Sequence, residues 1–399
     1  MATLPTPSPE ATSQSQQLTK LIEQKICDSN GWIDFAIFMH MALYTPRLGY
    51  YSGGAKKFAD VKTGAGDFVT APEISPLFAQ SVARQVAQVL AAINDQTVAN
   101  KTKTVQADIL EIGVGTGQLA ADLLLDLQQL NQLPKQYFIL EVSDYLRQIQ
   151  LETLQLKLPQ ALFERVVWLD SLPVDFVGLM FGNELLDALP VHLIHQTAEG
   201  LHERGVGFNG ELIWQDKPLQ ASNLHDYVSA YSLPNGYLTE ACLNATGLMN
   251  SLATSLKQGV ILMLDYGFGA GEYYHPQRNA GTLMCHYQHY AHTNPLINVG
   301  LQDITAHVNF TQIAEAALAQ DLTLAGYCNQ ASFLMNCGIL EILAETSPSD
   351  VATYAPLAAA AQKLLSPAEM GELFKVIAFS KNLDVDLIGF KSGDKSHNL

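Results

Sequence analysis

The segment Asp108–Leu119, DILEIGVGTGQL, places three glycines between an apolar strand pattern and an amphipathic helix pattern. The apolar run predicts a buried strand over residues 107–113, and the spacing over 118–130 predicts a helix. Glycine is needed where the backbone turns with a positive φ or where a ligand lies against the main chain. A glycine loop that follows a strand lies at the carboxyl end of that strand, which is the usual ligand crevice of an open α/β sheet.

Strand and helix patterns alternate after this loop. Further strands are predicted over 137–143, 165–171, 176–184 and 260–267, and helices over 144–155 and 239–258. This alternation predicts βαβ units and a doubly wound, mostly parallel sheet of the Rossmann-like α/β class. Three short alternating runs between residues 191 and 219, with Asn209–Gly210 as a tight turn, predict a hairpin insertion.

The rest of the chain adds segments on both sides of this core. Residues 1–17 are rich in Pro, Ser, Thr and Gln and are expected to be a disordered tail. The region 18–105 is expected to be helical, with a glycine- and aromatic-rich loop that covers a ligand. We expect the core over 106–330, including a polar insertion at 270–309, and then a helical insertion and a C-terminal edge strand over 331–399.

The glycine spacing discriminates between classes of ligand. The dinucleotide fingerprint G-x-G-x-x-G needs its third glycine one residue later, where Gln118 stands. The phosphate-binding pattern G-x-x-x-x-G-K does not occur in the sequence. The pattern E-x-G-x-G-x-G is the loop type that accepts the amino-acid part of S-adenosylmethionine (SAM). The sequence therefore predicts SAM as the cofactor, held at this loop by Glu111, Gly113, Gly115, Thr116 and Gly117.

Two further predicted strands end in acidic residues. Glu141 ends the second strand, where a carboxylate can accept hydrogen bonds from both hydroxyls of an adenosine ribose. Asp170 ends the third strand, where it can accept from an adenine amino group. Each acid could also be an ordinary solvated residue at a strand end, but the three strand ends together follow the order expected for adenosine. The predicted cofactor set therefore also contains Glu141, Val142, Asp170 and Ser171.

Composition and charge exclude several classes of protein. With 48% hydrophobic and 15% charged residues, the chain has the composition of a globular protein and not of a disordered one. No apolar run is long enough to cross a membrane. The 39 acidic and 22 basic residues give a net charge of −17, which disfavours nucleic-acid binding and favours a basic or small-molecule partner.

Cysteine and histidine patterns bear on compartment and metal content. The five cysteines are widely spaced without a C-x-x-C pattern, and no presequence pattern occurs, so we expect reduced thiols and a cytoplasmic protein. His286, His289 and His292 lack the acid that completes a zinc motif, so no metal site is expected there or elsewhere. No G-x-S-x-G elbow occurs, so nothing supports hydrolase chemistry.

Longer motifs resemble one family. They include LGYYS (48–52), GDFVTAPEIS (66–75), LEVSDYLRQIQ (140–150), NELLDALPVH (183–192) and GLQDITAHVNF (300–310). On these motifs the chain resembles the MidA-type SAM-dependent methyltransferases from about Asp34 to Asp394. It departs from the family's usual G-P-G-R-G loop at Val114 and Thr116, and Met284 replaces a family arginine. The resemblance implies a Rossmann-like methyltransferase that uses SAM and methylates arginine on a protein substrate.

Candidate residues for the acceptor site follow the fourth predicted strand. A guanidinium is best held by carboxylates, because its fork of N–H groups matches their oxygens. If a helix begins at Glu184, then Glu184 and Asp187 share a face of it. Alternatively, Asn183 caps this helix and the two acids balance its dipole. The catalytic candidates are Asn183, Glu184 and Asp187.

Other candidates come from the covering loop and from later strand ends. The family's loop closes over the cofactor, so the resemblance adds Asp67, Thr70 and Glu73 to the cofactor-binding set. The expected walls of the acceptor pocket are Tyr51, Phe68, Asp265, Tyr266 and His307. Each of these residues could instead serve only to pack its loop or the core.

The sequence therefore predicts a SAM-dependent methyltransferase that acts on protein arginine. One alternative is a small-molecule acceptor, because the fold does not determine the substrate. A second is a SAM-binding assembly protein that acts by docking a partner. A nicotinamide oxidoreductase is disfavoured by the position of the third glycine. The oligomeric state stays open.

Overall fold

The computed structural model describes residues 4–53, 70–99 and 106–399. The chain forms two compact units, each assembled from separate stretches of sequence. The first, here called the Rossmann unit, comprises Thr70–Leu186, Leu248–Gly269 and Asn309–Leu399. The second, the accessory unit, comprises the residues before Thr70 together with Asp187–Gly247 and Ala270–Val308.

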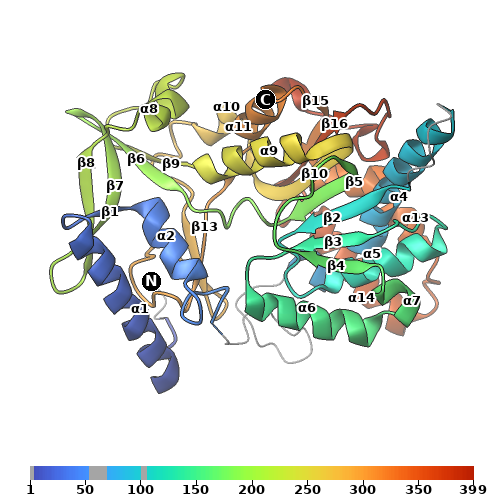
Figure 1. Ribbon diagram of the computed structural model, residues 1–399, viewed down its shortest axis with the longest axis horizontal. Coiled ribbons are helices and arrows are strands. Elements are labelled where there is room, and N and C mark those ends of the chain that lie inside the picture. Colours follow the sequence, from blue (N-terminus) through green and yellow to red (C-terminus); the bar gives the residue numbers. More distant parts are fainter. Residues whose placement is uncertain (1–3, 54–69, 100–105) are drawn as a thin grey trace. The chain divides into compact units, whose positions relative to one another are not determined.

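A mostly parallel sheet runs through the Rossmann unit (Figure 1). The short strand β14 (Val308–Asn309) pairs with β10 beside the main path of this sheet. The strands of the main path are β2 (Asp108–Ile112), β3 (Tyr137–Leu140), β4 (Val166–Leu169), β5 (Phe176–Asn183), β10 (Leu256–Phe268), β15 (Thr323–Asn329) and β16 (Phe374–Lys381). They lie in the order β15-β16-β10-β5-β2-β3-β4, and the neighbours from β10 to β4 are parallel. Successive strands are added on one side of β2 as far as β4 and then, from β5 onward, on its other side, so the strand order reverses between β2 and β5. Their carboxyl ends therefore flank the position at which open α/β sheets bind ligands.

Helices of the Rossmann unit pack on this sheet or on one another. They are α3 (Ala71–Ile74), α4 (Pro76–Ala99), α5 (Gln118–Gln129), α6 (Asp144–Lys157), α7 (Gln160–Phe163), α11 (Phe310–Leu318), α12 (Gln330–Asn336), α13 (Ile339–Ala344) and α14 (Val351–Leu365), with the short turns η1 (Ile388–Phe390) and η2 (Ser396–Asn398). α4 packs against α5 and against β5 and β10. The core between them contains buried side chains such as Phe78, Leu124 and Phe181. Burial of each such side chain contributes about 1.5–3 kcal/mol.

The C-terminal strand was expected at the edge of the sheet, and that prediction is wrong. β16 lies between β10 and β15, and antiparallel pairing on both sides makes β15 the edge. The alternation and β-branching of FKVIAFSK (374–381) are typical of an edge strand, but its polar residues Lys375 and Ser380 are both buried. The expected helical insertion before this strand is confirmed, because α12, α13 and α14 lie between the antiparallel strands β15 and β16 in the chain.

An antiparallel sheet forms the centre of the accessory unit. Its strands are β1 (Ile33–Asp34), β6 (His192–Thr197), β7 (Gly200–Phe208), β8 (Leu212–Pro218) and β9 (Tyr237–Ala241), in the order β1-β7-β6-β9 with β8 on β7. A second small sheet has the order β12-β11-β13, from β11 (Met284–Tyr287), β12 (Tyr290–His292) and β13 (Asp303–Thr305). Helix α2 (Phe35–Tyr44) packs on β6 and β7, and α1 (Pro9–Asp28) packs on α2. The predicted hairpin insertion at 191–219 is confirmed by β6, β7 and β8.

Several predicted boundaries differ from the structure. Helix α1 begins at Pro9 with Ser8 as its N-cap, so the prediction of a disordered tail is wrong for residues 9–17. The helix expected over 239–258 begins as β9 and becomes helical only in α9 (Leu243–Ser255), which leads into β10. The expected region 18–105 is divided, because α3 and α4 belong to the Rossmann unit.

The inserted segments also group differently from the expected domains. The hairpin insertion and most of the polar insertion, which includes α10 (Ala270–Tyr273), belong to the accessory unit together with α8 (Ser222–Ser229). These two inserted segments interrupt the sequence of the Rossmann unit at two places. They belong to the same unit as the N-terminal segment of the chain. Among the described residues, no helix combines the length and apolar character needed to cross a membrane.

Candidate active site

The glycine loop turns the chain from β2 into α5. Gly113, Gly115 and Gly117 have φ values of +68°, +57° and +86°, a region that L-residues with side chains rarely adopt. A Cβ atom on Gly113 would lie 2.8 Å from Leu185 Cδ1. The loop therefore requires glycine for both its backbone conformation and its packing, as the sequence predicted.

Gln150 connects this loop to two other strand ends, and sequence reasoning did not single it out. The fully buried side chain donates to the Gly115 carbonyl and to Glu141 Oε2, both at 3.1 Å. Its Oε1 accepts from Trp168 Nε1 at 3.1 Å. One amide thus joins the ends of β2, β3 and β4. The quoted motif 140–150 contains Gln150, but only the fold shows what it contacts.

Glu141 is buried at the end of β3. Its Oε1 accepts from the Ser143 backbone N–H at 2.9 Å, and burial raises the pKa of its carboxyl. The neighbouring Val142 side chain is 80% exposed. A carboxylate beside an exposed apolar side chain suits a ligand that presents hydroxyl groups and a flat ring, which is what an adenosine presents.

Asp170 and Ser171 are exposed just after β4. Arg147 pairs with Asp170 at 2.8 Å and donates to the carbonyls of Leu169 and Glu141, both at 2.7 Å. This arginine holds the ends of β3 and β4 together. The Asp170 side chain is 91% exposed, so its ion pair adds little stability and the carboxylate stays accessible to a ligand.

Glu111 is a buried residue of β2 and is not part of the glycine loop itself. Its Oε2 accepts from the Tyr137 hydroxyl at 2.5 Å. Burial raises the pKa of Glu111 to about 8, which favours the protonated carboxyl relative to an exposed glutamate. Its position before the glycine loop agrees with the predicted pattern, and its role as a cofactor residue stays a prediction.

Glu73 of α3 reaches the glycine loop. Its Oε1 accepts from the Thr116 hydroxyl at 3.2 Å, and its buried Oε2 has no hydrogen-bond partner among the described residues. Burial raises the pKa of Glu73 to about 7. Thr70 is the N-cap residue of α3 but makes no side-chain capping bond. The other two predicted loop residues, Asp67 and Phe68, lie outside the described residues.

Asn183 is the last residue of β5, and Glu184 follows it directly. No helix begins directly after them: residues 184–190 form bends and a turn. The expected shared helical face of Glu184 and Asp187 is therefore wrong, and so is the alternative in which Asn183 caps a helix. Glu184 instead has a φ of +50°, and its backbone N–H donates to the Leu264 carbonyl at 2.9 Å.

The Glu184 carboxylate is held from two sides. Its Oε1 accepts from the Ala71 backbone N–H at 3.3 Å and from Asn183 Nδ2 at 3.2 Å. Asn183 Oδ1 is buried and has no hydrogen-bond partner among the described residues. An amide oxygen in this state suits a ligand that donates an N–H or O–H group.

Asp265 positions the turn after β5, and its expected place in the acceptor pocket stays a prediction. It is buried, and its Oδ2 accepts from the backbone N–H groups of Leu185 and Leu186 at 3.0 and 2.7 Å. These bonds replace the helical bonds that the sequence suggested for this segment. Tyr266 is half-buried, and its ring packs on Phe374 at 5.4 Å between centroids.

The remaining candidates belong to the accessory unit. The Tyr51 hydroxyl donates to Asp303 Oδ1 at 2.9 Å, and its ring stacks on Tyr44. Burial, followed by the charge of Asp303, raises the pKa of Tyr51 well above its ordinary value. Asp187 is buried, and the backbone N–H of His307 donates to Thr282 Oγ1 at 3.0 Å. The described residues of the predicted cofactor set thus lie in the Rossmann unit, and Tyr51, Asp187 and His307 lie in the accessory unit.

Comparisons with known proteins agree with this geometry. A family model described as a putative S-adenosyl-L-methionine-dependent methyltransferase matches residues 81–328. A solved structure of a likely methyl transferase from Burkholderia thailandensis, bound to S-adenosyl-homocysteine, is 45% identical, covers 100% of both chains and has a TM-score of 0.93. The mitochondrial protein arginine methyltransferase NDUFAF7 of Danio rerio is 28% identical over 92% of this chain and 87% of its own. Its Homo sapiens counterpart is 27% identical over 88% and 80%.

S-adenosyl-homocysteine is what remains of SAM after its methyl group has been transferred, so the bound neighbour identifies the ligand class of this fold. The left-handed glycines, the buried Glu141 and the exposed Val142 fit that ligand, and SAM is the cofactor of this protein. The family match covers more than half of the chain, and the class I methyltransferase fold agrees with it. The chain belongs to the MidA-type family of SAM-dependent methyltransferases.

Proposed function

We propose that this methyltransferase transfers the methyl group of SAM to a guanidinium nitrogen of arginine on a protein substrate. The observation that carries the proposal is the Glu184 carboxylate, held at the end of β5 by the Ala71 N–H and the Asn183 amide. A carboxylate in this position can accept the paired N–H groups of a guanidinium.

In this reaction the protein residues do not have to activate the methyl donor. SAM supplies a methyl group on a positively charged sulfur that is already activated for displacement, so alignment of the acceptor and exclusion of water are the protein's main contributions. Glu184 and Asn183 would orient the acceptor nitrogen. The ionised Glu184 would also offset the positive charge of the guanidinium near the sulfonium.

Two further observations support a basic protein acceptor. The net charge of −17 attracts cationic partners over long range, and this attraction weakens with salt. The mitochondrial relatives carry the name protein arginine methyltransferase, at 27–28% identity. We also propose a cytoplasmic location, because none of the five cysteines forms a disulfide and three of them are buried.

In the decisive experiment, the purified protein and SAM with a labelled methyl group are added to an extract of cells that lack this protein. We expect label in protein, and methylarginine in its acid hydrolysate. Label confined to small metabolites would replace the proposal with a small-molecule acceptor. SAM binding without transfer to any fraction would favour an assembly protein that acts by docking a partner.

A further inference from the structure

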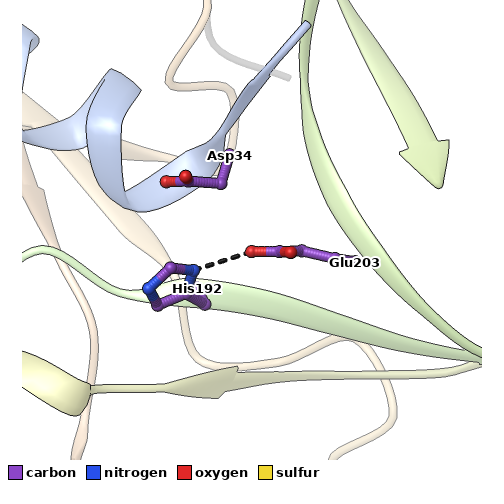
Figure 2. A group of neighbouring side chains, drawn as sticks. All are labelled: Asp34, His192 and Glu203. Atoms are coloured by element: carbon purple, nitrogen blue, oxygen red, sulfur yellow. Dashed lines mark hydrogen bonds and ion pairs between the residues drawn. The ribbon is translucent and has the colours of Figure 1, made fainter. Parts of the chain in front are cut away.

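In the accessory unit, an imidazole and two carboxylates from three separate elements converge. Asp34 ends β1, His192 begins β6 and Glu203 lies within β7. Each residue offers one ligand atom, and these atoms all lie within 4.8 Å of one another. Figure 2 shows the His192 ring and the Glu203 carboxylate facing each other, with the Asp34 side chain beside them. All three residues are half-buried.

The strand pairing produces this arrangement. β6 and β1 pair with successive stretches of one edge of β7, whose other edge pairs with β8. Asp34 lies opposite Gly205 and Ile194 lies opposite Glu203. Asp34 is also the N-cap of α2, because its Oδ1 accepts from the Ile37 N–H at 2.8 Å. That bond orients the carboxylate and leaves its second oxygen available. His192 Nδ1 lies 2.7 Å from Glu203 Oε1.

A neighbouring group in the same sheet shows how such charges are normally balanced. His195 Nδ1 lies 2.7 Å from Asp216 Oδ2, and Arg204 contacts the same carboxylate at 2.8 and 3.0 Å. One carboxylate there has a permanent cation. Around His192 there are two carboxylates, and among the described residues neither forms an ion pair with a lysine or arginine.

We propose that Asp34, His192 and Glu203 bind a divalent transition-metal ion. One imidazole nitrogen and two carboxylate oxygens are a donor set suited to Zn²⁺ or Mn²⁺, whereas Mg²⁺ prefers oxygen ligands alone. Ligand atoms around an ion at about 2.1 Å lie at most about 4.2 Å apart, so a small side-chain rotation closes the site. The ion would balance both carboxylates and connect the start of α2 to β6 and β7.

The test measures metal binding by the full-length protein in the absence of SAM. Cys27 is an exposed thiol and would bind zinc itself, so every variant is made in a Cys27→Ser background. After removal of metal with a chelator, calorimetry with Zn²⁺ and with Mn²⁺ should give one site per chain. Either ion should raise the melting temperature of the folded protein by mass action, and Mg²⁺ should bind more weakly.

Two variants and one matched control separate a site from adventitious binding. Asp34→Asn removes a charge but keeps the helix cap, because asparagine caps as well as aspartate does. Glu203→Gln removes the other charge. Each should weaken binding at least tenfold, whereas Asp216→Asn in the neighbouring histidine pair should leave it unchanged. Absence of a stoichiometric site in the unsubstituted protein, or equal affinity in Asp34→Asn, would overturn the proposal.

Discussion

The Thr116 hydroxyl donates to Glu73 Oε1 at 3.2 Å, and this contact joins the glycine loop to α3. Glu73 lies in the motif at residues 66–75, more than forty positions before the loop. Its carboxyl is largely buried, and burial raises its pKa from 4.5 to about 7. The contact therefore couples the protonation of Glu73 to the part of the fold that holds the cofactor.

A pH dependence of stability follows from Glu73. Its pKa is raised on folding, so the folded state holds the proton more tightly, and ionisation of Glu73 destabilises the fold as pH rises from about 4.5 to about 7. Glu73→Gln removes this penalty. The variant should gain stability relative to the unsubstituted protein between pH 5 and pH 7, with the difference level above that range, as measured by urea unfolding without SAM. A constant difference across this range would show that Glu73 titrates normally.

Gly115 is expected to be essential for cofactor binding. Its φ of +57° disfavours a β-branched side chain by about 1–2 kcal/mol, and a side chain there would also occupy the ligand's approach to the loop. Gly115→Val should abolish SAM binding in calorimetry while circular dichroism still shows the fold. Gly247→Ala is the control, because a Cβ there meets no atom within 4 Å. Unchanged SAM affinity in Gly115→Val would mean that the loop is only a turn.

NAD should not bind to the unsubstituted protein, because Gln118 occupies the position of the third glycine of the dinucleotide fingerprint. SAM should bind and raise the melting temperature. Calorimetric binding of NAD would contradict the interpretation of the glycine spacing.

Glu184→Gln tests the acceptor site. Glutamine keeps the oxygen that accepts from Ala71 and removes the negative charge. Loss of a charge-assisted hydrogen bond to a guanidinium costs roughly 1.5–3 kcal/mol, which corresponds to about a ten- to hundredfold slower methyl transfer. SAM affinity should stay nearly the same. The exposed Glu164→Gln serves as the control, and transfer at the unsubstituted rate would leave the arginine proposal resting on family names alone.

Gln150→Leu tests the amide that joins three strand ends. Leucine is similar in size but leaves Trp168 Nε1 and the Gly115 carbonyl without their partner. Each buried polar group left in this way costs about 1–3 kcal/mol. We expect lower stability in urea unfolding and SAM affinity reduced at least tenfold. Gln148→Leu, two positions away on the exposed side of α6, should change neither quantity.

Local pattern was enough to identify the glycine loop of the Rossmann unit and the class of cofactor that it binds. The strand, the three glycines and the following helix lie within Asp108–Gln129, where periodicity and positive φ are properties of neighbouring residues. Glu141 was recognised because it ends a strand. The hairpin insertion was recognised from short alternating runs and an Asn-Gly turn. These features depend on contacts close in sequence, so the sequence alone determined them.

Only the tertiary structure decided the features that depend on distant partners. Residues 184–190 turn instead of forming a helix, because Asp265 takes the N–H groups of Leu185 and Leu186 across 80 and 79 positions. β16 is internal because β15 pairs with its outer side. Asp34 meets His192 and Glu203 only through the pairing of β1, β7 and β6. Such contacts follow from the packing of whole elements, because no local pattern in the chain encodes which distant group will satisfy a polar side chain.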